Sequence, residues 1–405
     1  MMHFAAVLLL SICSICASAQ VQPSFFALST ANAGDLPKVP YGFLGHPGYL
    51  AWNFIETSRG SYNWKVFDKF VLAAPRVGKV AQIDLTLGYT PPWALANKSS
   101  CTALGGTACT MPPDNMQDWV DFVTALAGHY NGVALPHVAY YEIWNEANTA
   151  HFWTSTPAVL AQMAALAYPI IRADGHSQII TPSVVWAVGG GPIWMSQFLS
   201  AWTTLTRTGW PGMVSFHGYT SRTGVGAKLP IPLPESATST NAPLQTMLAA
   251  FCSMGSPCVS TEGGWGMNGV SDSDMQAAWI AHYQILCAAS PAKFCNWFEW
   301  GIPAVSGRIE NTNGTPTQAG LALQVVDGWI VSQNVSACAQ QDNIWSCQLG
   351  SGMVVWDSSQ TCSAGICTTA PYTPPTQYTG YYDLTGAYWP MSGTVNLGVK
   401  PILMQ

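Results

Sequence analysis

Short apolar, β-rich runs alternate with longer amphipathic stretches along most of the chain. The helical stretches show the spacing of one buried helix face: Met116–Tyr130, Pro157–Ala173, Ala242–Phe251, Asp272–Ala288 and Thr317–Ser332. The strand-like runs are Phe25–Thr30, part of Tyr41–Phe54, Ala81–Gly88, Val138–Asn145, Gln178–Val185, Met213–Tyr219, Pro257–Thr261 and Phe294–Trp300. Eight strand–helix repeats predict a (β/α)8 TIM barrel of the α/β class.

Polar residues mark where several of these helices begin. Asp114 is expected to cap the first helix, and Ser271 the helix that starts at Asp272. Thr156 is expected to cap the second, with Pro157 at its first position. The run Gly189–Gly191 predicts a loop after the fifth strand.

The pattern changes after Ser332, where helical periodicity stops. Gly, Pro and Ser turns separate four strand-like runs, and Pro371–Pro375 is expected to interrupt strands. We therefore expect a barrel over 20–333 and a small β-sandwich-like domain over 334–405. The four runs are Asn343–Leu349, Met353–Asp357, Tyr378–Leu384 and Thr394–Met404.

Residues 1–19 resemble a secretory signal, with an apolar stretch before the small residues Ala17-Ser18-Ala19. Ten cysteines remain after it, in close neighbours along the chain. Five local disulfides, each closing a short loop, are the simplest arrangement, although spacing alone leaves the connectivity open. A metal site is disfavoured because no paired CxxC spacing is present. The neighbours are Cys101/Cys109, Cys252/Cys258, Cys287/Cys295, Cys338/Cys347 and Cys362/Cys367, of which the last two are expected to tie loops of the small β domain.

Charged residues make up only 8% of the chain and the net charge is −6, without a basic run, which disfavours nucleic acid as a partner. No stretch after the signal is long and apolar enough to span a membrane. Eighteen Trp and fifteen Tyr supply flat apolar faces with polar edges, which suit a sugar groove. Sequons occur at Asn97, Asn313 and Asn334.

Two glutamates stand where a barrel enzyme places catalytic carboxyls. Glu146 ends the fourth predicted strand in YEIWNEAN (141–148), and Glu262 ends the seventh in VSTEGGW (259–265). Strand ends far apart in sequence meet at one rim of a barrel. Glycoside hydrolysis needs one carboxyl to protonate the leaving oxygen and another to attack the anomeric carbon, about 5–5.5 Å apart in retaining enzymes. We expect Glu146 to be the acid/base, kept protonated by the charge of Glu262, the nucleophile.

Trp144-Asn145-Glu146 resembles the acid/base motif of clan A glycoside hydrolases, in which the Asn binds the substrate 2-hydroxyl. Further segments are similar to glycoside hydrolase family 39, in the expected order over most of residues 25–330. They are GSYNW (60–64), GYTPPWA (88–94), Phe152-Trp153, FHGY (216–219) and Thr261-Glu262. The resemblance implies a retaining hydrolase of β-linked saccharides, without a cofactor.

The resemblance also implies roles for other side chains. Tyr219 is expected to bond the nucleophile, and His217 to contact the substrate or the acid. Glu142 lacks the Arg that the family often carries on the second strand, so we expect it to be hydrogen-bonded or protonated, with His46 a candidate substitute. Trp300 is expected to form a platform below the sugar, with Trp93, Trp153 and Trp265 as weaker candidates.

Two alternatives remain open from the sequence. Clan A motifs overlap, so a hydrolase of the family 5 or 79 type fits the same segments. A carbohydrate-binding extracellular protein that has lost catalysis fits the missing Arg. The sugar, the linkage, endo or exo action and the oligomeric state are not encoded in any motif of the chain.

Overall fold

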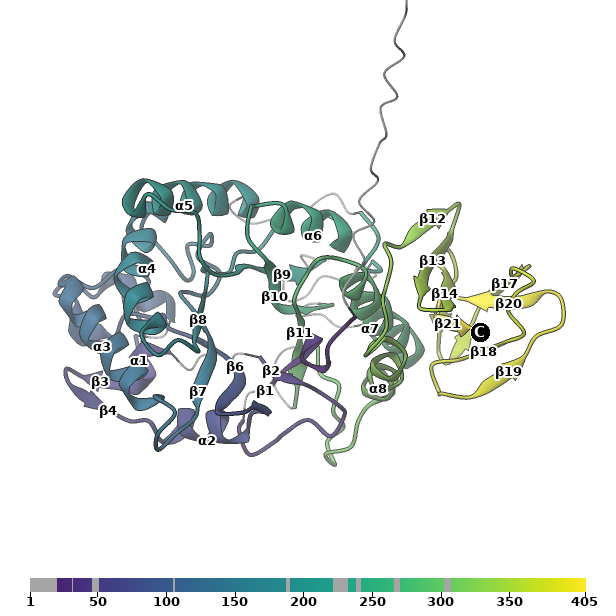
Figure 1. Cartoon of the computed structure of the whole chain (residues 1–405), viewed down its shortest axis with the longest axis horizontal. Helices are drawn as coiled ribbons and strands as arrows, with labels where there is room; N and C mark the ends of the chain where they lie inside the picture. Colours follow the sequence, from purple (N-terminus) through teal and green to yellow (C-terminus); the bar gives the residue numbers. More distant parts are fainter. Residues whose placement is uncertain are drawn as a thin grey trace, which may run out of the picture.

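A closed parallel barrel with a small β domain beside it forms the protein (Figure 1). The computed structural model describes residues 20–30, 32–45, 51–104, 106–186, 190–220, 232–237, 242–265, 270–301 and 307–405. The predictions for the signal segment 1–19, for His46 and for Gly189 lie outside these residues.

Eight parallel strands build the barrel in the order β8-β7-β6-β2-β1-β11-β10-β9. Bridges from Ile180 to Met213 and from Val185 to His217 join β8 to β9 and close the ring. The predicted (β/α)8 barrel is therefore confirmed. The strands are β1 (Phe26–Thr30), β2 (Phe43–Leu44), β6 (Val80–Thr86), β7 (His137–Glu142), β8 (Gln178–Ile180), β9 (Val214–Tyr219), β10 (Cys258–Gly264) and β11 (Cys295–Trp300).

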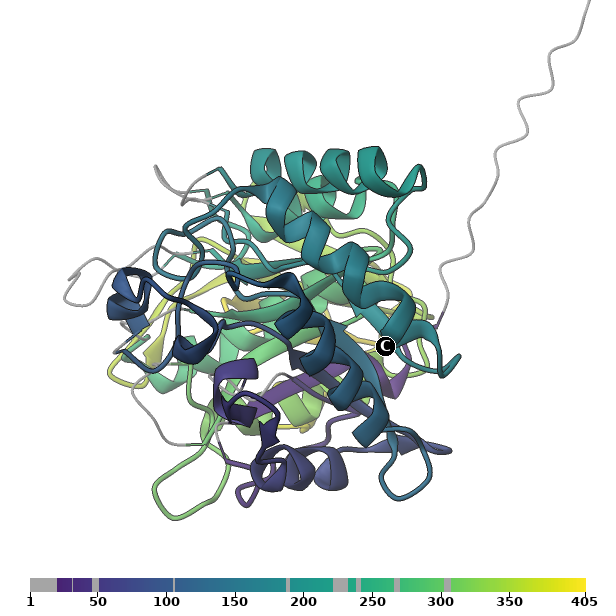
Figure 2. The same ribbon diagram turned by 90° about the vertical axis from the view of Figure 1, so that its left-hand side faces the viewer.

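Helices surround the barrel, and Figure 2 faces the side that α3, α4 and α5 cover. Their apolar faces pack on the strands and join one large core. Within the described residues no helix is long and apolar enough to cross a membrane. The helices are α1 (Trp52–Ile55), α2 (Lys65–Ala73), α3 (Met116–His129), α4 (Pro157–Arg172), α5 (Gly191–Thr206), α6 (Leu244–Cys252), α7 (Ser273–Ala288) and α8 (Gln318–Ile330).

Small strands outside the barrel ring complete this part of the chain. β3 (Glu56–Ser58) pairs with β4 (Ser61–Tyr62), and β5 (Arg76–Val77) pairs with β6 at the edge of the barrel sheet. Only two residues of the predicted run Tyr41–Phe54 form a strand, and its end is helical in α1.

The predicted helix starts are partly corrected. Thr156 caps α4 with Pro157 first, as expected, but Asn115 rather than Asp114 caps α3. Asp114 instead accepts the backbone N–H of Ala96. Asp272, whose carboxylate accepts two backbone N–H groups, replaces Ser271 as the cap of α7.

The glycine run after the fifth strand also differs from the prediction. Gly191 begins α5, and Gly190 adopts φ 62° as the residue before it. A left-handed conformation costs glycine little, and Gly191 is the first residue of the helix rather than part of a loop.

The C-terminal residues form the expected small β-sandwich-like domain. Six strands pair in the order β12-β13-β14-β21-β18-β19, and β17 pairs with β20 beside them. Pro371 lies inside β17, contrary to the prediction that it interrupts strands. The strands are β12 (Ala339–Gln341), β13 (Ile344–Leu349), β14 (Gly352–Asp357), β15 (Cys362–Ser363), β16 (Ile366–Cys367), β17 (Thr369–Tyr372), β18 (Gly380–Tyr382), β19 (Tyr388–Pro390), β20 (Val395–Gly398) and β21 (Ile402–Met404).

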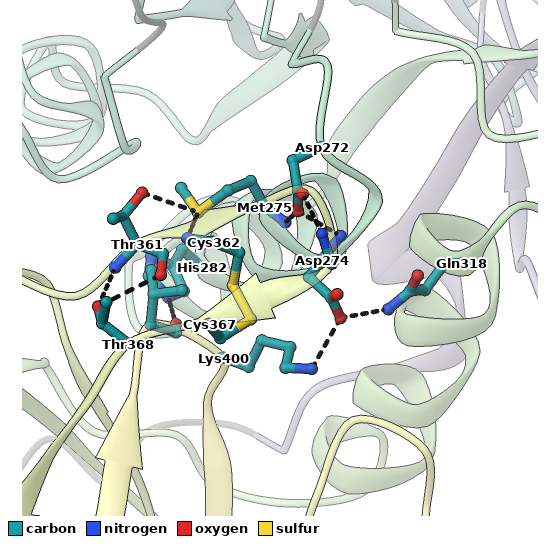
Figure 3. The surroundings of a disulfide bond; sticks show 12 residues. Asp272, Asp274, Met275, His282, Gln318, Thr361, Cys362, Cys367, Thr368 and Lys400 are labelled. Atoms are coloured by element: carbon teal, nitrogen blue, oxygen red, sulfur yellow. Dashed lines mark hydrogen bonds and ion pairs between the residues drawn. A yellow bond between two sulfur atoms is a disulfide. The ribbon is translucent and has the colours of Figure 1, made fainter.

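All five proposed disulfides are present, each between neighbours in the sequence. Figure 3 shows the bond between Cys362 and Cys367 against α7, where the Cys362 N–H contacts Met275 Sδ at 3.2 Å. Nearby, Lys400 Nζ lies 2.7 Å from Asp274 Oδ1. These contacts fix the β domain on α7. The domain boundary between residues 333 and 334 stays a prediction.

The five disulfides are Cys101–Cys109, Cys252–Cys258, Cys287–Cys295, Cys338–Cys347 and Cys362–Cys367.

Two of these cysteines lie in the protein interior. Cys347 lies inside β13, opposite Val354 of β14, and is buried. Cys109 is fully buried as well, and its backbone forms a β-bridge with Thr90. Sulfur packs like a small apolar group, so burial in a core suits both residues. Cys109 and Cys347 therefore stabilise the interior, and neither lies on a surface that a substrate could reach.

Candidate active site

A short loop after β7, not the strand itself, positions Glu146. β7 ends at Glu142, so the predicted strand Val138–Asn145 is too long and strand alternation does not extend to Glu146. Glu146 adopts φ 40°, a left-handed conformation that costs a non-glycine residue roughly 1–2 kcal/mol. Its N–H donates to Ser183 Oγ at 3.0 Å, and Thr149 Oγ1 donates to its carbonyl at 3.0 Å. These hydrogen bonds hold the backbone of the loop at Glu146 in place.

Glu262 lies within β10, which extends past the predicted end at Thr261 to Gly264. It pairs with His217 on β9, just after a register shift between Ser260 and Glu262. The Tyr219 hydroxyl donates to Glu262 Oε2 at 2.8 Å. A side chain at Gly263 would meet the Tyr283 hydroxyl at 1.8 Å, so the backbone needs glycine there. The strand therefore fixes Glu262 beside its tyrosine.

His217 brings the two carboxylates together. Its Nδ1 lies 2.9 Å from Glu146 Oε1 and 3.5 Å from Glu262 Oε2. One carboxylate oxygen of Glu146, one of Glu262 and one ring nitrogen of His217 all lie within 4.8 Å of one another. The imidazole is fully buried, whereas the carboxylate side chains keep 19% and 11% of their surface exposed. The site is thus open on the carboxylate side only.

Electrostatics at this site favour a protonated histidine and a neutral tyrosine. Burial opposes the charge of His217, but the nearby charges of Glu262 and Glu146 outweigh it and raise the pKa of the imidazole. Burial first, and then the charge of Glu262, raises the pKa of Tyr219 well above its ordinary value. Tyr219 therefore remains a hydrogen-bond donor to the carboxylate.

Asn145, expected to bind the substrate, is nearly buried beside Glu146. Its Oδ1 has no hydrogen-bond partner within the described part of the chain. Asn145 also forms a hydrogen bond with Tyr89. Burial raises the pKa of Tyr89 well above its ordinary value, although this hydrogen bond alone would lower it. Sequence reasoning assigned no role to Tyr89 or Ser183, although Tyr89 stands in the GYTPPWA segment.

Glu142 lies deeper in the barrel than Glu146. It is fully buried, and three hydroxyl groups from β6, β9 and β10 surround it. Thr86 Oγ1 lies at 3.5 Å, and Ser215 Oγ and Thr261 Oγ1 each at 3.3 Å. This environment agrees with the expected hydrogen-bonded carboxyl.

The tryptophans expected to stack on sugar are largely packed in the core. Trp300 and Trp265 are fully buried, and Trp153 is 3% exposed. Trp93 is half-buried, and the Arg59 guanidinium lies over its ring at 5.3 Å from the centroid. The structure therefore shows packing roles for Trp153, Trp265 and Trp300, and their proposed contact with sugar stays a prediction.

Solved structures of glycoside hydrolases resemble this chain. A family 39 glycoside hydrolase from Bacteroides cellulosilyticus gives a TM-score of 0.65 at 15% identity, covering 95% of this chain and 81% of that one. A GH39 enzyme from Xanthomonas axonopodis pv. citri gives 0.63 at 14%, covering 96% and 95%. A monomeric β-xylosidase from Caulobacter crescentus gives 0.60 at 14%, covering 96% and 97%. The chain shares their fold.

At these identities the likeness shows the fold alone. As a similarity of fold, it confirms the resemblance to family 39 and the combination of a barrel with a β domain. No family model matches the sequence, and neither does any curated protein. The roles of individual residues therefore rest on the geometry of this chain.

The donor atoms of Glu146, His217 and Glu262 are also close enough together to hold a metal ion. Carboxylate oxygens and imidazole nitrogens can both bind zinc. In glycoside hydrolysis, however, one carboxylate attacks carbon and the other carries a proton, and a bound dication would compete with both roles. The two uses of the cluster are distinguishable by experiment.

Proposed function

We propose that the protein is a retaining glycoside hydrolase that cleaves β-linked oligosaccharides or polysaccharides by double displacement. Glu146 is the acid/base and Glu262 the nucleophile. The observation that carries the proposal is the convergence of both carboxylates on His217 Nδ1, at 2.9 and 3.5 Å. One oxygen of Glu146 and one of Glu262 lie within 4.8 Å of each other. This closeness supports direct attack, because retaining enzymes hold their carboxyls about 5–5.5 Å apart.

In the first step Glu262 attacks the anomeric carbon while Glu146 protonates the leaving oxygen. The hydrogen bond from Tyr219 to Oε2 orients the attacking carboxylate. Asn145 provides a nearly buried amide for the sugar hydroxyl next to the reacting carbon. Bonds to that hydroxyl strengthen as the transition state forms.

In the second step Glu262 is an ester and has lost its charge, so Glu146 can accept a proton from water. His217 contacts Glu146 throughout. A protonated imidazole at 2.9 Å stabilises Glu146 whenever that carboxyl is ionised, which is the state left behind by the first proton transfer. His217 therefore acts as a positioning residue for the acid/base.

The first substrates to test are aryl β-xylosides, because one protein of the same fold is a β-xylosidase. We also propose that the protein is secreted. Five disulfides and the signal-like residues 1–19 support this, and sequencing the N-terminus of the mature protein tests it.

Covalent trapping tests the mechanism directly. A 2-deoxy-2-fluoro β-xyloside with a good leaving group should add one fluorosugar to the intact protein, and peptide mapping should place it on Glu262. Proton NMR of the first product formed should show the β-anomer. An adduct on another residue, or inversion, would overturn the assignment. Sugar binding without adduct or hydrolysis across a glycoside panel would favour a non-catalytic binding protein.

A further inference from the structure

We propose a second carbohydrate-binding site, in the hollow between α8 and the β18–β19 hairpin of the β domain. It takes a segment of a neutral polysaccharide chain. Figure 1 shows where α8 and the two strands lie. None of the residues lining this hollow belongs to the cluster around Glu146 and Glu262. The class of ligand rests on the proposed function, whereas the shape and chemistry of the hollow do not.

The hollow has one helical wall and one strand wall, and its volume is about 1050 Å³. The helical wall is the exposed face of α8, where Gln318, Leu321, Gln324 and Gly328 follow one another at helical spacing. An added Cβ at Gly328 would meet nothing within 4 Å, so this wall is open. The volume is at the upper end of the range for small-molecule sites, enough for more than one sugar ring.

The strand wall presents an exposed aromatic platform. Trp389 is 50% exposed, and it is the one exposed tryptophan among eighteen, all of which lie in the described residues. Its Nε1 donates to Asp383 Oδ2 at 2.8 Å, which fixes the plane of the ring. Tyr381 lies directly opposite Trp389 in the antiparallel pair, so both side chains are on the same face. A fixed, exposed indole beside a tyrosine is suited to stacking on sugar rings.

The two charged side chains that line the hollow, Lys400 and Asp383, already have partners in the protein. Lys400 Nζ lies 2.7 Å from Asp274 Oδ1. The Asp383 carboxylate accepts hydrogen bonds from Thr385, Ala387 and Trp389. The polar groups that remain on the walls are largely amides, such as those of Gln324 and Asn396. Amides, aromatic rings, an ion-paired lysine and a carboxylate already bound by neutral donors match a neutral saccharide better than an acidic or basic partner.

The experiment measures binding separately from catalysis. The Glu262→Gln protein is run in native gels containing xylan or mixed-linkage β-glucan, and its retardation gives the affinity. Two further changes are added singly to this background: Trp389→Ala removes the platform, and Gly328→Arg fills the open wall. Gly128→Arg is the matched control, because Gly128 is a helical glycine on α3 that also has nothing within 4 Å. Ile366→Ala removes another exposed apolar side chain of the β domain.

We expect Trp389→Ala and Gly328→Arg each to weaken retardation by about ten-fold, the scale of a buried tryptophan anchor. The two controls should leave it unchanged. In the otherwise native enzyme, the same changes should leave kcat/KM on an aryl β-xyloside within about two-fold, since that substrate is too small to use a second site. Equal retardation of all variants, or no retardation by either polysaccharide, overturns the proposal. Retardation that depends on Trp389 in a protein without hydrolytic activity supports this site while the proposed function fails.

Discussion

Two histidines with fully buried side chains bind carboxylates within the described residues, and the surroundings of the two pairs differ. His217 lies at the end of β9 beside Glu146 and Glu262, whose side chains are partly exposed. His282, on α7, contacts Glu235 at 3.0 Å, and both side chains are buried. Its Nε2 lies 2.8 Å from the Val399 carbonyl of the β domain.

The His282 pair is closed because each polar atom has a protein partner. Trp356 Nε1 donates to Glu235 Oε1 at 2.9 Å, and the Trp356 ring lies 4.5 Å from the imidazole. Burial raises the pKa of Glu235, but the charge of His282 and hydrogen bonds outweigh it and lower that pKa overall. The closed pair joins the β domain to the barrel. The open pair of His217 leaves its carboxylates partly exposed, so the same side-chain types are closed off in one place and accessible for the proposed chemistry in the other.

The largest effect expected is the loss of turnover in Glu262→Gln. An amide cannot attack the anomeric carbon, so kcat/KM should fall on the order of 10⁴-fold or more, as for other covalent nucleophiles. The change is nearly isosteric, and the melting temperature should change little. Steady-state rates on aryl β-glycosides and thermal denaturation check both parts. Near-normal activity in this variant would rule out Glu262 as the nucleophile.

Glu146→Gln should give a loss that depends on the leaving group. General acid catalysis contributes roughly 10²–10⁴-fold, and substrates with poor leaving groups need it most. We therefore expect a large drop on an alkyl β-glycoside or a disaccharide, and a smaller one on a dinitrophenyl β-glycoside. A series of leaving groups measures the difference. A uniform loss across the series would contradict the role of Glu146 as acid.

Glu235→Gln should lower stability and leave the chemistry intact. Removing one partner of a buried ion pair costs about 3–5 kcal/mol in the free energy of unfolding. Because the pKa of Glu235 is lowered from 4.5, the wild-type pair stabilises the fold above about that pH and loses this contribution as pH falls below it. Urea unfolding across this range measures the effect. Asp342→Asn, at the exposed turn between β12 and β13 of the β domain, is the control and should change little.

His217→Asn should alter the pH dependence of both activity and stability. The folded-state pKa of His217 is raised above 6.5, so its ion pairs contribute fully below about that pH and lose their contribution as pH rises through the folded value. The stability difference between wild type and variant should therefore shrink from pH 5.5 to pH 9. The basic limb of the rate profile should also shift. His129→Asn, which breaks a histidine–aspartate pair between α3 and α2, should leave the rate profile unchanged.

The barrel could be predicted because its signals are local. Apolar runs of the right length and glycines or prolines at their ends specify β9 and β11 within a residue of the predicted bounds. The errors lie where tertiary contacts decide. Pro371 lies in a strand because β17 pairs with β20, and this partner is more than twenty residues away, where a local pattern does not reveal it. Gly191 begins a helix, but the neighbouring glycines made a loop the simpler prediction.

The site was predictable in its residue types but not in its backbone. The order of the motifs indicated Glu146, Glu262, His217 and Tyr219, and the structure brings these four together. The left-handed turn at Glu146 depends on Ser183, which no motif marks. Burial of Trp300 depends on packing around the whole barrel, which a single strand does not encode.

The smallest effect expected is that of a chelator on activity. This test distinguishes a site that transfers protons from a site that needs a metal ion. Incubation with EDTA, followed by its removal, should leave kcat/KM unchanged, because attack by Glu262 and proton transfer by Glu146 need no ion. Added Zn²⁺ should instead inhibit by binding both carboxylates and His217, and EDTA should reverse that inhibition. The Glu235→Gln variant, altered only at the closed pair, should show the same inhibition. Activity that is lost with EDTA and restored by Zn²⁺ would replace double displacement with metal-assisted hydrolysis at the same three side chains.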